Sequence, residues 1–276
     1  FSNVGRAFDG GVVMLTFKDF RIDLIHSTLY ESSQAPDTID GDQQLTGVWM
    51  TFSRAQSSVF HLYALTDQDL RQNRAGDVRL NRATLGGRYE NTTANWSMEM
   101  EANLQTGVMD FDRTILALYA SGALTYHFAG RGEPRLGIGV DYLSGDKADT
   151  DAYECFNTLF PARHKHFGYM DYFLNIPTDT RQLGLIDMMA TARLSPQQKW
   201  HLQGDLHFFQ LSREAGLSDG LSRDLGAELD LGFSYDYSQA VNFTFGGAAF
   251  LPGQVMQEWY GQDLSFWSYV QTTVNF

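Results

Sequence analysis

The sequence contains one cysteine, Cys155, so no disulfide bond can form within the chain. It also lacks any run of roughly 20 uncharged apolar residues, the length that a membrane-spanning helix needs, which excludes a helical membrane protein. Basic residues are scarce: 20 Lys and Arg stand against 33 Asp and Glu, for a formal net charge of -13. Because contacts to phosphate are made largely by Lys and Arg, this balance argues against a nucleic-acid partner.

The sequence is rich in alternating apolar residues, which make up 43% of it, with aromatic residues at 14%. In many segments the apolar side chains fall on every second position, which is the pattern of β-strands with two unlike faces. Helical spacing is hard to find. We predict thirteen strands, at residues 11–18, 20–31, 44–54, 57–66, 78–89, 94–106, 113–128, 134–144, 181–194, 199–211, 223–236, 240–251 and 263–276.

The links between these segments alternate in length. The short links are 18–19, 55–56, 90–94, 129–133, 195–198 and 237–239, and the longer ones are 32–43, 67–77, 107–112, 145–180, 212–222 and 252–262. In an antiparallel meander this rhythm puts every tight turn at one end and every large loop at the other. Outer-membrane barrels have this arrangement, with tight turns on the periplasmic side.

Two segments show the unlike faces clearly. On 94–106, one face carries Trp96, Met98, Met100, Ala102 and Leu104, and the other carries Glu99, Glu101, Asn103 and Gln105. On 223–236, Leu225, Ala227, Leu229, Leu231, Phe233 and Tyr235 oppose Asp224, Glu228, Asp230, Ser234 and Asp236. Several acidic side chains on one face cannot point into a dry core without a large cost, so that face must meet water.

Alternation alone does not show which face is outside, because a soluble sandwich turns its polar face outward and an outer-membrane barrel does the reverse. Aromatic residues near strand ends favour the membrane barrel, since they form girdles at its two interfaces. They are Tyr30, Tyr89, Trp96, Phe128, Trp200, Tyr235 and Phe276. We predict an all-β, antiparallel transmembrane β-barrel of the outer-membrane porin type. A soluble carbohydrate-binding β protein is the alternative.

The final segment ends in SFWSYVQTTVNF, with Leu264, Phe266, Val270, Val274 and Phe276 on one face. A terminal aromatic on an alternating last strand resembles the signal that the barrel assembly machinery reads, so we predict this role for Phe276. Thirteen is an odd number, whereas bacterial single-chain barrels usually have an even one, and open edges in lipid are costly. We therefore expect residues 1–276 to form a single barrel domain that is the C-terminal part of a larger barrel.

Residues 134–173 read PRLGIGVDYLSGDKADTDAYECFNTLFPARHKHFGYMDYF, and they resemble the alginate export family of outer-membrane porins. The shared elements are Asp141-Tyr142, Ser144-Gly145-Asp146, Phe156, Leu159-Phe160-Pro161, His164-Lys165 and Phe167 to Asp171. Weaker likeness covers 8–11, 85–90, 101–107, 206–212, 227–235 and 250–253.

The resemblance implies an eighteen-stranded, monomeric barrel in the bacterial outer membrane, whose electropositive, arginine-lined pore passes an anionic polyuronate. The net charge of -13 departs from this picture, because it does not fit a strongly cationic pore. We predict a passive outer-membrane channel for an anionic polysaccharide such as alginate, or for related solutes. A porin of the same family for other small solutes is the alternative.

Arginines on the water-facing side are the candidates for contact with a polyanion, because guanidinium binds carboxylate in a two-pronged fork and stays charged. Strand parity predicts that Arg82 and Arg88 face Glu99 and Glu101 on the next strand. Further candidates are Arg113, Arg135, Arg181 and Arg193. A ladder of ion pairs that satisfies charges along the wall without meeting a solute is the alternative.

The link 145–180 is too long for a passive turn. Its aromatic residues Phe156, Phe160, Phe167, Tyr169, Tyr172 and Phe173 argue against disorder. We predict that it folds into or over the pore as a constriction. The candidate residues there are Arg163, His164, Lys165, Tyr169 and Asp171. A plug that packs on the inner wall without solute contact is the alternative.

An enzyme is the rival class, because His201, Asp205 and His207 share a strand face. No nucleophile motif accompanies them or the pair His164 and His166, so we predict no catalytic site and no cofactor. Ca²⁺ prefers several carboxylate oxygens, which makes an acidic outer loop with Asp146, Asp149 and Asp151 a weak candidate for a cation site.

Overall fold

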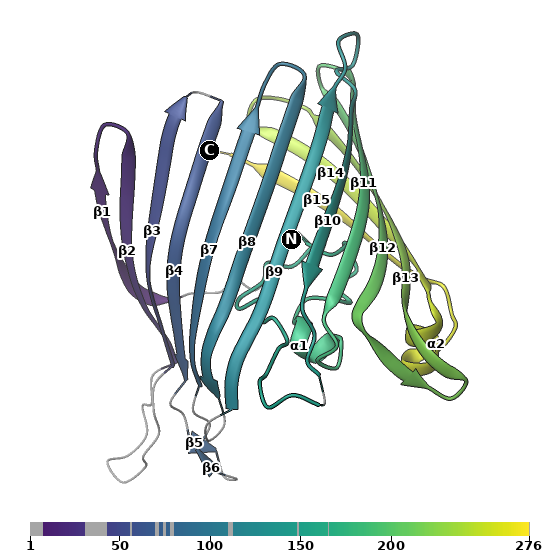
Figure 1. Ribbon diagram of the computed structural model, residues 1–276. Coiled ribbons are helices and arrows are strands. Elements are labelled where there is room, and N and C mark those ends of the chain that lie inside the picture. Colours follow the sequence, from purple (N-terminus) through teal and green to yellow (C-terminus); the bar gives the residue numbers. More distant parts are fainter. Residues whose placement is uncertain are drawn as a thin grey trace.

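The computed structural model of the protein describes residues 8–30, 43–55, 57–69, 72–73, 76–77, 80–109, 113–147, 149–164 and 166–275. Figure 1 shows a strongly curved antiparallel sheet with a long loop lying against its concave side. The sheet has 13 strands, ordered as they occur in the sequence. No helix in the described part of the chain is long and apolar enough to cross a membrane.

The elements have the following bounds. The strands of the sheet are β1 (Asp9–Thr16), β2 (Phe20–Tyr30), β3 (Gln43–Ala55), β4 (Ser58–Asp69), β7 (Leu80–Thr92), β8 (Trp96–Met109), β9 (Arg113–His127), β10 (Arg135–Leu143), β11 (Leu185–Gln197), β12 (Trp200–Leu217), β13 (Gly220–Asp236), β14 (Val241–Pro252) and β15 (Ser265–Val274). A separate small hairpin is made by β5 (Gln72–Asn73) and β6 (Gly76–Asp77). The two short helices are α1 (Ile176–Asp179) and α2 (Gln254–Tyr260).

Each of the thirteen predicted strands corresponds to one strand of the sheet, so the predicted antiparallel meander is confirmed. The turns that join β1 to β2, β7 to β8 and β9 to β10 lie at the top of Figure 1, whereas α1, α2 and the turn between β12 and β13 lie at the bottom. Two links are shorter than predicted. β8 continues to Met109, and β12 and β13 continue to a turn at 218–219, where Leu217 pairs with Gly220. The polar residues of 212–222 were wrongly predicted as a loop, because strand pairing continues through them.

Exposure is inverted relative to a soluble protein. On the convex side Ile138 is 67% exposed and Phe266 is 72% exposed, whereas Glu228 on the concave side is 0% exposed. Apolar side chains turned outward and carboxylates turned inward are the pattern of a transmembrane barrel. The predicted orientation of the two strand faces is therefore the one found. We call the concave side of the sheet the inward face.

One predicted face assignment is wrong. Leu225 was placed with the outward residues of β13, yet it is 0% exposed and packs in the inward apolar cluster beside Val255. The pairing of β12 with β13 shifts by one residue next to Gly226, whose φ is 124°. A Cβ on Gly226 would stand 2.2 Å from the Leu251 carbonyl oxygen, so this bulge requires glycine. The extra residue turns Leu225 inward.

The sheet does not close within the described residues, where β1 pairs with β2 alone and β15 pairs with β14 alone. All eight residues of β1 are exposed.

Candidate functional site: the inward face and its loop

The arginines that point inward are paired with carboxylates. Arg88 on β7 contacts Glu99 at 3.0 Å and Glu101 at 3.6 Å on β8, and it contacts Glu90 on its own strand at 2.7 Å. Arg82 does not contact these residues, because Gly107 stands opposite it in β8. It instead makes a buried ion pair with Asp67 on β4, at 2.5 Å. Two arginines that were predicted to act together thus belong to separate networks.

The other predicted wall arginines differ in exposure and position. Arg193 on β11 grips Asp205 on β12 with two nitrogens, at 2.7 and 3.1 Å. Arg135 on β10 is more open, with Glu133 3.8 Å away. Arg181 was predicted at the start of a strand, but β11 begins at Leu185, and Arg181 follows α1 with its guanidinium 4.1 Å from the Trp259 ring centroid. Its position is corrected from the wall to the loop.

The segment between β10 and β11, residues 144–184, lies against the inward face. We call it the inner loop. Phe156, Phe167, Phe173 and Ile176 from this loop pack in one apolar cluster with inward side chains of the strands, such as Phe209. Figure 1 shows this loop and α1 inside the curve of the sheet. The aromatic residues of this link therefore pack against the strands, and the constriction of a solute path stays a prediction.

Hydrogen bonds fix the inner loop to four strands. Gln105 on β8 donates to the Asn157 carbonyl and accepts from the Asn157 N–H, both at 2.9 Å. Arg113 on β9 holds both carboxylate oxygens of Asp146. On β13, Glu228 accepts from the Met170 N–H at 2.8 Å and Asp230 from the Tyr169 N–H at 3.1 Å. On β12, Gln203 donates to the Tyr169 hydroxyl.

Close approach of the loop backbone to Glu228 depends on Gly168, which has a φ of 84°. A Cβ there would stand 2.6 Å from the Glu228 carboxylate. Six described residues of the loop that are not glycine also have positive φ, between 50° and 66°: Leu159, His164, Phe167, Asp171, Arg181 and Gln182. Bulky side chains rarely adopt this conformation, so the contacts to the wall, not local preference, determine the path of the loop.

The predicted constriction residues differ in their surroundings: His164 contacts Tyr169 and Asp171, whereas Arg163 is exposed. His164 donates from Nδ1 to the Tyr169 carbonyl oxygen at 2.6 Å and from its backbone N–H to Asp171 Oδ1 at 2.8 Å. Its ring stacks on Trp267 of β15, with the ring centroids 4.7 Å apart. Burial is the larger cause that raises the pKa of Tyr169 to about 12, and the nearby Asp205 carboxylate is the second. Arg163 is exposed, and Lys165 lies outside the described residues, as does Phe276.

Sequence reasoning missed the residues that hold the loop. Glu228, Asp230 and Gln105 were predicted on a water-facing side, but each is at most 1% exposed because the inner loop covers it. Their alternation signals the correct face. Their partners lie 52 to 61 residues away in the sequence, and no local pattern indicates such contacts.

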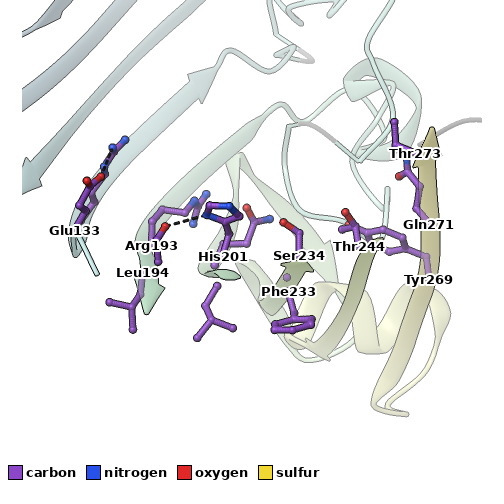
Figure 2. Close-up of a pocket in the computed structure, with 15 residues that line it drawn as sticks. Glu133, Arg193, Leu194, His201, Phe233, Ser234, Thr244, Tyr269, Gln271 and Thr273 are labelled. Atoms are coloured by element: carbon purple, nitrogen blue, oxygen red, sulfur yellow. Dashed lines mark hydrogen bonds and ion pairs between the residues drawn. The ribbon is translucent and has the colours of Figure 1, made fainter. Parts of the chain in front are cut away.

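A cavity of about 710 Å³ lies on the inward face at the tight-turn ends of β10 to β15 (Figure 2). Its polar lining includes Arg135, Arg193, Gln203, Tyr269 and Gln271. In Figure 2 the side chains of His201, Ser234 and Thr244 point to the opposite side of the strands from Leu194 and Phe233. The inward side of this cavity is therefore polar.

The three residues weighed as an enzyme site belong to separate networks. His201 has Ser195 Oγ 3.0 Å from Nδ1 and Asp236 Oδ2 3.0 Å from Nε2, and its side chain is 44% exposed. His207 instead contacts Asp187 at 2.8 Å beneath the inner loop. Asp205 is held by Arg193. The shared strand face predicted from sequence does not bring these groups to one reacting centre.

The three acidic residues predicted as a weak cation site differ: Asp149 and Asp151 are exposed, whereas Asp146 is engaged by the protein. Asp146 accepts from Arg113 and from the Glu154 N–H at 2.9 Å. Across the described ranges, no group of three or more His, Cys, Asp or Glu side chains is gathered for a metal ion.

Two solved structures are compared with this chain, and the first of them supports the fold. OccK11 (OpdR) of Pseudomonas aeruginosa is similar with a TM-score of 0.54 and 13% sequence identity, over 98% of this chain and 71% of that chain. The toluene transporter TodX of P. putida gives a TM-score of 0.37 and 10% identity, over 95% of this chain and 81% of that chain. No curated protein matches the sequence.

The family comparison agrees with the resemblance seen in residues 134–173. The family model described as alginate export matches residues 1–268, nearly the whole length of the sequence. The chain therefore belongs to the alginate export family of porin-type β-barrels.

Proposed function

We propose that this protein is a channel of the bacterial outer membrane through which hydrophilic solutes diffuse passively. The observation that carries the proposal is the inverted exposure of the sheet: bare apolar side chains face outward, and a polar inward face borders a cavity of about 710 Å³. Membership of a family of porin-type barrels supports a channel over an enzyme.

A more specific candidate than hydrophilic solutes in general is an alginate-like polyuronate, and two observations favour it. The family is described as alginate export. Arg135 and Arg193 border the large cavity, where guanidinium groups could bind carboxylates of a passing chain. Against it, Arg193 already grips Asp205 and Arg135 has Glu133 nearby, so a polyuronate would compete with protein carboxylates.

The inner loop is proposed to narrow the channel. It lies across the inward face between β8 and β13, and its contacts to Gln105 and Glu228 hold it there. In this proposal the exposed Arg163 lies beside the solute path.

Planar-bilayer recording of the full-length protein tests the function. We expect stepwise ion currents in symmetric KCl, because a water-filled interior conducts ions. Oligogalacturonate added to one side should interrupt the current if a polyuronate enters, and an uncharged polyethylene glycol of similar size is the control. If the protein is folded, as shown by heat-modifiable migration on a gel, and inserts stably without any current, the proposal of a channel is contradicted. Currents that oligogalacturonate leaves unchanged would remove the polyuronate candidate and leave the general porin.

A further inference from the structure

A second pocket, of about 410 Å³, lies between the inner loop and the inward face of β3 to β10. Sites for small molecules typically measure roughly 300–1,000 Å³ and combine aromatic walls with a few polar groups. The aromatic residues that line this pocket are Trp49, Tyr63, Tyr119, Phe156, Phe160 and Phe167. The pocket is separate from the cavity at the tight-turn end, and the two share no lining residue.

The wall of this pocket includes a flat aromatic pair. Trp49 on β3 and Tyr63 on β4 are direct cross-strand partners, and their rings lie 3° from parallel with centroids 4.1 Å apart. The Trp49 indole N–H donates to His61 at 3.0 Å, and the Tyr63 hydroxyl donates to Glu101 at 2.5 Å. Each ring is therefore fixed at its polar end. Because the two rings also cover one face of each other, a ligand can contact only the apolar surface that lies outside the stack.

Gly86 on β7 makes the room in which Tyr63 lies. A Cβ on Gly86 would stand 2.2 Å from Tyr63 Cε2 and 1.9 Å from Asn103 Oδ1. The neighbouring Gly87 has no such role, because a Cβ there would meet Leu62 Cδ2 at 3.4 Å, an ordinary contact. Of the two adjacent glycines, only Gly86 is therefore needed for the position of the Tyr63 ring.

The charges of the pocket distinguish between ligands. Arg88 and Glu101 line it side by side, with Arg88 Nη1 3.6 Å from Glu101 Oε2. Glu90 and Glu99 also contact Arg88, so one guanidinium stands among three carboxylates. A ligand carboxylate would meet this surplus of negative charge. A ligand cation would compete with Arg88, which already contacts all three carboxylates.

We propose that this pocket binds an uncharged pyranose ring, with the C–H face of the sugar against Trp49. Pyranose rings present an apolar face bounded by hydroxyl groups, which fits an aromatic surface edged by polar side chains. Glu101 accepts from one hydroxyl and Arg88 donates to its neighbour. The inference rests on the proposed channel function, because the pocket lies on the inward face, but it differs from that function in favouring a neutral sugar over a uronate.

Isothermal titration calorimetry on the detergent-solubilised full-length protein tests the proposal with maltotriose, trigalacturonate and the glucosamine trimer. We expect saturable binding of maltotriose, with the two charged trisaccharides at least about tenfold weaker. Trp49→Ala should weaken maltotriose binding by about tenfold or more, because the stacking surface is lost. Gly86→Ala should do the same by displacing Tyr63, and Gly87→Ala should leave binding unchanged.

Trigalacturonate binding as tightly as maltotriose would overturn the proposal, and so would an unchanged affinity in Trp49→Ala. If Trp49→Ala fails to fold, the maltotriose affinities of Gly86→Ala and Gly87→Ala are compared instead, and equal affinities would overturn the proposal. Conductance of the same preparations separates the two claims. Protein that conducts ions but binds no maltotriose overturns the pocket and leaves the channel. Protein that binds maltotriose through Trp49 without conducting overturns the channel and leaves the pocket.

Discussion

At the scale of single residues, charged side chains on the inward face act mainly on one another. The pair Arg82–Asp67 is almost fully buried, with side chains 7% and 5% exposed. Removing one partner of such a pair typically costs about 3–5 kcal/mol, because the other charge is left buried and uncompensated. These arginines therefore contribute to the wall before any solute arrives.

Cys155 provides a residue-scale prediction. Burial in the inner loop raises the pKa of this thiol to about 12, and only the thiolate reacts with alkylating reagents. We expect iodoacetamide at pH 8 to label the folded protein at least about a hundredfold more slowly than the protein unfolded in urea. Mass spectrometry of the modified peptide measures both rates. Equal rates would show that the loop does not bury this residue in solution.

The same shift has a defined sign for stability. The folded pKa lies above the usual thiol value, so the buried thiol stabilises the folded loop at neutral pH. This contribution is lost as the pH rises from about 9 through about 12. Labelling of Cys155 should therefore accelerate within that window.

At the scale of elements, the inner loop is an addition to the sheet that is held by side chains. Gln105 pairs with both backbone groups of Asn157, as a neighbouring strand would, and Glu228 and Asp230 each satisfy one loop N–H. Two further backbone bonds join Tyr153 to β9, at 2.7 and 2.9 Å. Together these contacts keep the loop against the inward face.

Deleting residues 150–170 should raise the single-channel conductance, because the deletion removes protein from the interior. Gln105→Leu should give a smaller effect, seen as extra current noise, since it leaves the N–H and C=O of Asn157 unpaired at a cost of about 1–3 kcal/mol. Thr106→Ala, the adjacent and outward-facing exposed residue, is the control. Bilayer recording measures all three. Conductance and selectivity equal to those of the intact protein after the deletion would exclude a constriction.

How far sequence reasoning reaches depends on the range of the interactions. Strands and their order follow from local alternation, so all thirteen segments were predicted. The bulge at Gly226 shifts the register by one residue, which a strict period of two cannot anticipate. Partner choice is also not local: Arg82 had two neighbouring strands and pairs with Asp67 on β4, and Arg181 lies on Trp259 from a distant segment.

At the scale of the whole molecule, the described sheet has two edges, at β1 and β15. Unpaired backbone N–H and C=O groups are costly in lipid. We propose that further strands complete the wall between these edges, as expected for a larger barrel. Mass spectrometry of the protein from native outer membranes measures its length, and a complete mature protein that starts at Phe1 would contradict the proposal.

The balance of charge on the inward face predicts the ion selectivity of the channel. The inward carboxylates of the described strands include Asp23, Asp67, Glu99, Glu101, Asp141, Asp187, Asp205, Glu228 and Asp230, and the inward arginines include Arg21, Arg82, Arg88, Arg135 and Arg193. Carboxylates thus exceed guanidinium groups, which agrees with the formal net charge of -13. A surplus of fixed negative charge raises the local concentration of cations.

We therefore expect a channel that favours K⁺ over Cl⁻. Under a roughly tenfold KCl gradient, the reversal potential should have the sign that indicates cation selectivity. Its magnitude should decrease as the total salt concentration rises, because the Debye length falls from about 10 Å at 0.1 M to about 3 Å at 1 M. Glu99→Gln, on the exposed side of the Arg88 network, should reduce the potential. The lipid-facing Met100→Leu on the same strand should not. Anion selectivity would instead favour the polyuronate, because it would show that the arginines outweigh the carboxylates along the solute path.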